Sequence, residues 1–123
     1  MFVYIMRNQS MPGLYKIGFS SDPELRATGL SSASGIPTPF EVIHAIDCMT
    51  ERQARRAEAS AHFILEYSRV TTSREFFALD HQNIGVRALI AGSFIAWKPD
   101  YSDAEWLELA GRLAEWPMDR SAA

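Results

Sequence analysis

Residues 2–26 read FVYIMRNQSMPGLYKIGFSSDPELR, and the patterns within this stretch decide the fold. Residues 2–6 alternate with β-branched and aromatic side chains, which predicts a strand, and residues 14–19 predict a second one. The Asn, Ser, Pro and Gly residues between them favour a turn, so the two strands are expected to form a hairpin. Asp22-Pro23-Glu24 is typical of a helix start, because it supplies a capping acceptor, a proline and an acidic residue in the first turn.

The chain continues with alternating strand and helix signals. Residues 40–48 predict a third strand, and residues 75–79 predict a short fourth one. Between them, Thr50 and Gln53 have the spacing of a capping box, so a helix should begin there and reach about residue 67. Its apolar stripe recurs at helical spacing: Ala54, Ala57, Ala61, Ile64 and Leu65. We expect an α/β (α+β) fold, with helices packed around a small, mainly antiparallel sheet of three or four strands.

Two more helices are expected after the fourth strand. The first has a candidate cap at Asp80, and a second capping box at residues 102–105 opens the last helix. The last helix carries a large apolar stripe: Trp106, Leu109, Leu113 and Trp116. We expect its tryptophans to pack in the core rather than to stack on bases. The predicted organisation is a domain over residues 1–80, a helical extension over 81–117 packed on it, and a tail over 118–123.

The composition is that of a soluble single domain. Of 123 residues, 47% are hydrophobic and 22% are charged, which is enough to fill one core and ordinary for a globular protein. Cys48 is the single cysteine, so an intrachain disulfide and a CxxC-type metal site are excluded. The N-terminal residues lack the pattern of a secretory signal, and no apolar run approaches the roughly 18 residues of a membrane span. We expect a cytoplasmic protein with no membrane partner.

Charge is unevenly distributed along the chain. The net charge of −3 argues against a general binder of polyanions, but residues 1–98 carry ten Lys or Arg against nine Asp or Glu. Five arginines gather on and after the capped helix: Arg52, Arg55, Arg56, Arg69 and Arg74. They fit phosphate contacts with nucleic acid. They equally fit a solvated face balanced by Glu51 and Glu66, and both interpretations stay open.

Six residues suited to a phosphodiester follow one another along the predicted elements: Tyr4, Lys16, Gly18, Arg26, Glu58 and His62. Strand alternation places Lys16 and Gly18 on one face, and a glycine there lets a phosphate approach. Glu58 and His62 are four residues apart, so they project from one side of their helix. A carboxylate is a suitable ligand for a hard ion such as Mg²⁺, and the planar guanidinium of Arg26 matches phosphate oxygens.

Each of these residues also has an ordinary structural interpretation when it is taken alone. Tyr4 would be a half-buried strand tyrosine, Lys16 an edge-strand lysine and Arg26 a solvated helix residue. Glu58 and His62 would form a weak surface pair. Against this, Glu58 lies close to the alanine stripe, and a carboxylate at a core boundary is unfavourable without a partner or a metal.

The order and spacing of these residues resemble the GIY-YIG nuclease superfamily over about residues 2–80. Val3-Tyr4-Ile5 and Lys16-Ile17-Gly18 stand in place of its two tripeptides, and Glu58 matches its metal-binding glutamate. More narrowly, the chain looks like the phage T5 open-reading-frame and meiotically up-regulated-gene branch, whose members read K-I-G, then D-P and R, then E-x-x-x-H, then E-F/W-F. The superfamily's late asparagine has no clear equivalent, and Glu75 is a further candidate for a related role.

The resemblance implies a divalent-metal-dependent endonuclease that hydrolyses phosphodiesters in nucleic acid, with DNA as the expected partner. One Mg²⁺ or Mn²⁺ ion on Glu58 would polarise the scissile phosphate, and Tyr4 would orient or deprotonate the attacking water. Arg26 would neutralise the developing charge, and Lys16 would bind a non-bridging oxygen. His62 would donate to the phosphate or act as a general acid or base.

Two other functions remain open at this stage. A DNA-binding module would keep the same fold and cleft without turnover. A protein–protein adaptor would use the C-terminal helices, and Trp106 and Trp116 would then be exposed.

Overall fold

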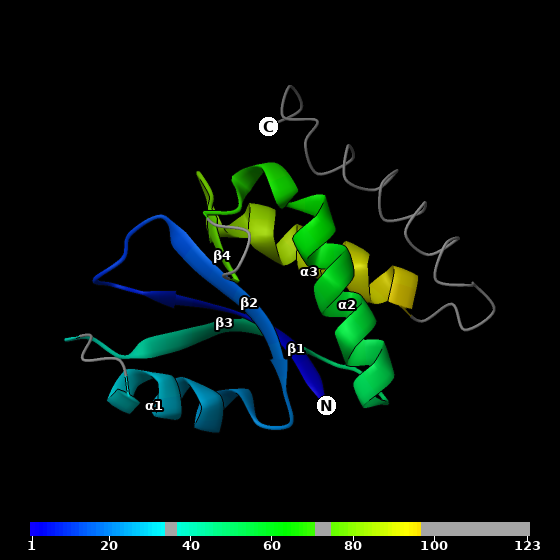
Figure 1. Cartoon of the computed structure of the whole chain (residues 1–123), viewed down its shortest axis with the longest axis horizontal. Helices are drawn as coiled ribbons and strands as arrows, with labels where there is room; N and C mark the ends of the chain where they lie inside the picture. Colours follow the sequence, from blue (N-terminus) through cyan, green and yellow to red (C-terminus); the bar gives the residue numbers. More distant parts are fainter. Residues whose placement is uncertain (34–36, 71–74, 97–123) are drawn as a thin grey trace.

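A four-stranded antiparallel sheet lies between helices on its two faces (Figure 1). The structure is a computed structural model that describes residues 1–33, 37–70 and 75–96. Its strands are β1 (Phe2–Asn8), β2 (Leu14–Ser20), β3 (Phe40–Asp47) and β4 (Phe76–Ala78), in the order β3-β1-β2-β4. Its helices are α1 (Pro23–Ala33), α2 (Glu51–Ile64), the 3₁₀ turn η1 (Glu66–Ser68) and α3 (Gln82–Ala96). The α/β (α+β) fold with a small antiparallel sheet is therefore confirmed.

Local side-chain contacts fix the hairpin and begin both long helices, as predicted. The hairpin turn uses Asn8, whose Oδ1 accepts from the Ser10 amide, and Gly13, whose φ of +79° favours glycine. Asp22 Oδ1 accepts from the Leu25 amide at 3.1 Å and so caps α1. Thr50 caps α2 in the same way, because its Oγ1 accepts from the amide of the residue three positions on.

The helix ends differ from the prediction at two places. The second helix was expected to reach about residue 67, but α2 ends at Ile64 and tightens into η1 after Leu65. The third helix begins at Gln82, and the side chain that accepts from its first turn is His81 rather than the predicted Asp80. The capping box at 102–105, the Trp106–Trp116 stripe, the tail and Arg74 lie outside the described residues.

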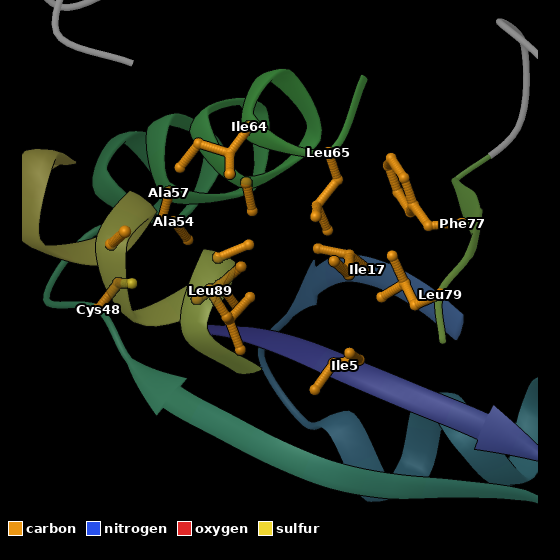
Figure 2. Packing of buried hydrophobic residues seen from close by; sticks show 14 residues of the cluster. Ile5, Ile17, Cys48, Ala54, Ala57, Ile64, Leu65, Phe77, Leu79 and Leu89 are labelled. Atoms are coloured by element: carbon orange, nitrogen blue, oxygen red, sulfur yellow. The ribbon is translucent and has the colours of Figure 1, made fainter. Parts of the chain in front are cut away.

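The main core fills the face of the sheet that α2 and α3 cover (Figure 2). Val3, Ile5 and Ile17 point to this face and are fully buried. The small residues of α2 let α3 come close, since a Cβ added to Gly92 would lie 2.8 Å from the Ala57 carbonyl oxygen. The predicted stripe of α2 is buried throughout: Ala54, Ala57, Ala61, Ile64 and Leu65. No helix of the described part is both long and apolar enough to cross a membrane.

A second, smaller cluster lies on the α1 face of the sheet. It contains Tyr4 and Met6 from β1, Ala27 from α1 and Phe40 from β3. Tyr4 is 1% exposed, so it is a buried residue and not the half-buried strand tyrosine of the ordinary interpretation. The second cluster therefore places a phenol beneath α1, on the face opposite the main core.

The outer edge of β2 is only partly covered by a strand. Within the described residues, β4 pairs with residues 14–16 of β2, and the amide of Ile17 donates to the Glu75 carbonyl just before β4 begins. Beyond these pairs, the outer edge of β2 has no strand beside it within the described residues, and we call this stretch the open edge of β2. Side chains from α2 and from the α1 face of the sheet can meet there.

Candidate active site

His62 from α2 covers the open edge of β2. Its Nε2 lies 2.8 Å from the Ile17 carbonyl oxygen. Because a carbonyl can only accept, Nε2 carries the proton and Nδ1 presents its lone pair. That Nδ1 lies 4.0 Å from Glu58 Oε1, one turn earlier on the helix. The contact places Glu58 at the opening between the two faces of the sheet, although the apolar side of α2 packs on the main core.

Gly18 makes room for the phenol of Tyr4, its partner across the β1–β2 pair. A Cβ on Gly18 would lie 2.6 Å from Tyr4 Oη and 3.2 Å from Glu75 Oε2. The phenol oxygen also accepts a hydrogen bond from Arg26, which reaches over from α1. Side chains from β1, from α1 and from the residue before β4 therefore lie near Gly18.

Lys16 is buried and is held by Glu75. It is 9% exposed, and its Nζ lies 2.8 Å from Glu75 Oε2 and 5.5 Å from the ring centre of Phe76. In the β1–β2 register Lys16 stands opposite Met6, on the same face as Tyr4, whereas Tyr15 packs toward the main core. The predicted sharing of a face by Lys16 and Gly18 is confirmed, and Glu75 enters the site as its second carboxylate.

The ionised form of Glu58 is disfavoured, because most of its side chain is removed from water. The side chain is 17% exposed. Burial, and then the charge of Glu75, raise the pKa of Glu58 from 4.5 to about 7, against the opposing charges of Lys16, Arg55 and Arg69. Near neutral pH this carboxyl is therefore partly protonated, and an added positive charge would favour its ionised form.

Tyr4 and His62 are neutral at physiological pH for the same physical reason. Burial, and then the charge of Glu75, raise the pKa of Tyr4 to about 12, although the Arg26 hydrogen bond acts in the opposite direction. Burial lowers the pKa of His62 below 6.5. A neutral phenol donates a hydrogen bond more readily than it removes a proton, so Tyr4 is suited to donating.

The arginines of α2 separate into two groups. Arg55 shares a stripe with Glu58 and lowers its pKa, while its guanidinium lies over Phe19 and 3.7 Å from Glu51. Arg52 and Arg56 lie on a different stripe of the helix, turned away from Glu58 by the helical period. Arg55 therefore lies at the edge of the site, whereas Arg52 and Arg56 lie away from it.

Arg69 was not among the residues predicted to form the centre of the site. It follows η1, and its charge acts on both Glu58 and His62. Nothing in the sequence distinguishes it from the exposed arginines nearby, because its position depends on a contact with β4 that no local pattern encodes. The side chains that act on one another around the open edge of β2, by contact or by charge, are Tyr4, Lys16, Arg26, Glu58, His62, Arg69 and Glu75.

Most of the length of the chain matches the model of one protein family. A profile described as the T5orf172 domain matches residues 1–90, which include every residue of the convergent site. The chain belongs to the T5orf172 domain family. This family is associated with GIY-YIG-like, nuclease-type proteins, which agrees with the resemblance seen in the sequence, and it suggests an interaction with nucleic acid. No curated protein and no solved structure matches this T5orf172 domain.

The site of this T5orf172 domain offers few ligands for a metal. Among the residues that the structure describes, no group of three or more His, Cys, Asp or Glu side chains could hold an ion. Glu58 and Glu75 are nevertheless close enough for the charge of one to raise the pKa of the other. An ion bound here would therefore rely on these carboxylates together with water or substrate oxygens.

Proposed function

We propose that this protein is a cytoplasmic, divalent-metal-dependent endonuclease of the GIY-YIG type that hydrolyses phosphodiesters in DNA. The observation that carries the proposal is the convergence at the open edge of β2. A phenol, an ammonium and a guanidinium lie there with a carboxylate whose pKa is raised to about 7. Titratable groups that perturb one another in this way are typical of functional sites.

The donor set fits one Mg²⁺ or Mn²⁺ ion. Burial disfavours the ionised form of Glu58 despite the surrounding cations, so a divalent ion would relieve the cost of ionising it. Glu58 would hold the ion, and Glu75, whose charge acts on Glu58, would assist. Carboxylate oxygens suit hard ions, and Mg²⁺ keeps several waters, so a site with one or two carboxylates is sufficient. When bound, such an ion supplies Lewis-acid polarisation of the phosphate.

The protein's own side chains orient the water, stabilise charge and bind the phosphate. Tyr4, as a neutral phenol, orients the attacking water, and Arg26 stabilises the negative charge that develops on the phosphate. Lys16 binds a non-bridging oxygen after leaving Glu75, or shares its protons with both. His62 is not free to donate a proton to the phosphate, because its Nε2 proton is already donated to the Ile17 carbonyl.

A DNA-binding module without turnover is the second candidate. The observation that favours it is the pairing of Lys16 with Glu75 at 2.8 Å, which holds the ammonium in the absence of substrate. If that pair persists in the complex, the site keeps its arginines for binding but lacks a free lysine. The adaptor alternative depends on Trp106 and Trp116, which lie outside the described residues.

The test is cleavage of supercoiled plasmid and single-stranded oligonucleotides with Mg²⁺, with Mn²⁺ and with chelator. We expect metal-dependent cutting by the wild type and its loss in Glu58→Gln, which keeps the size of the side chain but removes the charge. Glu51→Gln, an exposed position on the same helix, is the matched control and should cut normally. Binding that weakens with salt but gives no cutting supports the module, and cutting retained by Glu58→Gln removes Glu58 from the metal-binding role.

A further inference from the structure

The backbone around Arg69 is fixed beside β4. Arg69 forms an isolated bridge with Phe77, and its amide donates to the Glu66 carbonyl at 3.2 Å. The next amide, that of Val70, donates to the Phe76 carbonyl at 3.0 Å. The position from which the Arg69 side chain projects is therefore set by two secondary-structure elements, η1 and β4.

The side chain of Arg69 packs inward, toward the candidate active site. Its guanidinium carbon lies 5.5 Å from the ring centre of Phe77, and that ring packs against the imidazole of His62 at 5.1 Å. Only 19% of the Arg69 side chain is exposed, against 64% for Arg55. Arg69 is thus a largely buried cation one aromatic ring away from His62.

One donor of this guanidinium is buried and unsatisfied within the described part of the chain. Its Nε is buried and has no hydrogen-bond partner among the described residues. Its Nη1 lies 3.9 Å from Glu66 Oε2, which is too long for a hydrogen bond, and Glu66 is half-exposed. A buried cation with unused donors is unfavourable unless an anion completes its environment.

The structure points to a second phosphate subsite at Arg69. We propose that its guanidinium binds a phosphate oxygen on the side of the reaction centre formed by η1 and β4, whereas Arg26 serves the side formed by α1. This inference rests on the proposed function, because it takes the phosphate to belong to bound nucleic acid. The recognised chemistry is a phosphate oxygen, which a nucleic-acid backbone and free phosphate both supply.

The charges around Arg69 agree with this assignment. Its guanidinium is separated from His62 by the ring of Phe77, so its positive charge lies near the groups that would meet the substrate. The planar guanidinium offers two parallel donors to a phosphate, which a lysine at the same place would not. Packing over Phe77 reduces the number of conformations that the side chain must give up on binding.

The first test measures the binding of a short duplex in chelator over a range of salt concentrations. Arg69→Gln should weaken binding by about tenfold or more and flatten the plot of log K against log salt concentration by about 0.9, the value for one lost phosphate contact. Arg69→Lys should keep the slope but lose part of the affinity. Arg87→Gln removes the same charge from an exposed position on α3 and should leave affinity and slope near those of the wild type.

A purely structural role for Arg69 gives a different result. Arg69→Gln would then lower the midpoint of thermal unfolding, while the folded variant would match Arg87→Gln in affinity and in salt slope. That outcome overturns the inference and leaves the proposed function intact, because the wild type still binds.

A second measurement needs no variant and follows the Arg69 Nε–H signal of the wild type by NMR. We expect it to shift when the duplex is added. Duplex binding without this shift overturns the subsite alone. A shift with inorganic phosphate but no binding of duplex or single-stranded DNA supports the subsite for free phosphate and removes the nucleic-acid function. No response to either ligand overturns both proposals.

Discussion

The two faces of the sheet bury different kinds of side chain. Toward α2 and α3, the sheet presents Val3, Ile5 and Ile17 to an apolar layer rich in alanine and leucine. Figure 2 shows Ile5 and Ile17 facing this layer. Toward α1, the same strands present Tyr4 and Lys16, both buried and both polar. The strands alternate between these faces residue by residue, so one hairpin supplies both the main core and half of the candidate site.

The difference shows where this small domain buries ionisable side chains at a cost in free energy. Apolar burial on one face stabilises the fold. The other face carries Tyr4, whose ionised form is disfavoured by burial. The faces meet where β4 ends, and Glu58 reaches that point from the helix that covers the apolar face. Changes on the apolar face should therefore alter stability, and changes at the meeting point should alter chemistry and pH dependence.

The largest effect is expected from Arg26→Ala. Loss of the guanidinium removes the hydrogen bond to Tyr4 and a positive charge at the transition state, so turnover should fall by about 10²-fold. Stability should change little, because Arg26 is exposed on α1. Plasmid cleavage at saturating Mg²⁺ measures the effect, with Arg87→Ala as the control. An unchanged rate would place Arg26 outside the reaction centre.

The next effect concerns pH and stability in chelator. The folded protein holds the Glu58 proton up to about pH 7, whereas the unfolded chain releases it near 4.5. Between these values the folded state binds more protons, so the free energy of unfolding of the wild type falls as pH rises. Relative to Glu58→Gln, the fall should be on the order of 3 kcal/mol, complete above about pH 7 and absent below 4.5.

Urea unfolding at several pH values measures this difference. Glu51→Gln is the control, because it makes the same substitution at an exposed position of the same helix. Parallel curves for the wild type and Glu58→Gln would mean that Glu58 is not buried as the structure has it.

A pair of glycine substitutions sharpens the comparison between the faces. Gly18→Ala places a methyl group 2.6 Å from Tyr4 Oη, and Gly92→Ala places one 2.8 Å from the Ala57 carbonyl oxygen. Each should cost about 1–3 kcal/mol through overpacking. Only Gly18→Ala should also lower the cleavage rate of the folded protein, because it displaces the phenol. Adding Tyr4→Phe to Gly18→Ala should recover part of the stability but none of the activity, and equal rate losses in both glycine variants would contradict the division.

The smallest effect is expected from Thr50→Ala. Loss of its hydrogen bond from the Gln53 amide should cost about 1 kcal/mol, measured by urea unfolding. The cleavage rate of the folded variant should stay unchanged, since the cap lies two turns from Glu58. A rate loss larger than the loss of folded protein would show that the start of α2 belongs to the site.

Sequence patterns predicted the parts of the fold that local contacts fix. The caps at Asp22 and Thr50, the hairpin and the alanine stripe of α2 depend on neighbours within one or two turns, and they were predicted correctly. The end of α2 was not, because the change to η1 after Leu65 depends on how the following segment meets β4.

The site could be predicted as a set of residues but not as a geometry. Spacing along the strands placed Lys16 and Gly18 on one face. The contacts of Lys16 with Glu75 and of His62 with Ile17 join residues 59 and 45 positions apart, so no local pattern encodes them. Arg69 carries no local signal at all, since its burial depends on packing over Phe77.

The most direct test of the central claim is to add Mn²⁺ to the wild type above pH 7 and follow the broadening of amide signals by NMR. A paramagnetic ion held at the open edge of β2 should broaden the signals of Gly18, Glu58 and His62 first, and Glu58→Gln should abolish this pattern. Broadening centred on another part of the molecule, or unchanged in Glu58→Gln, would contradict the claim that the two faces of the sheet meet in a metal-dependent site.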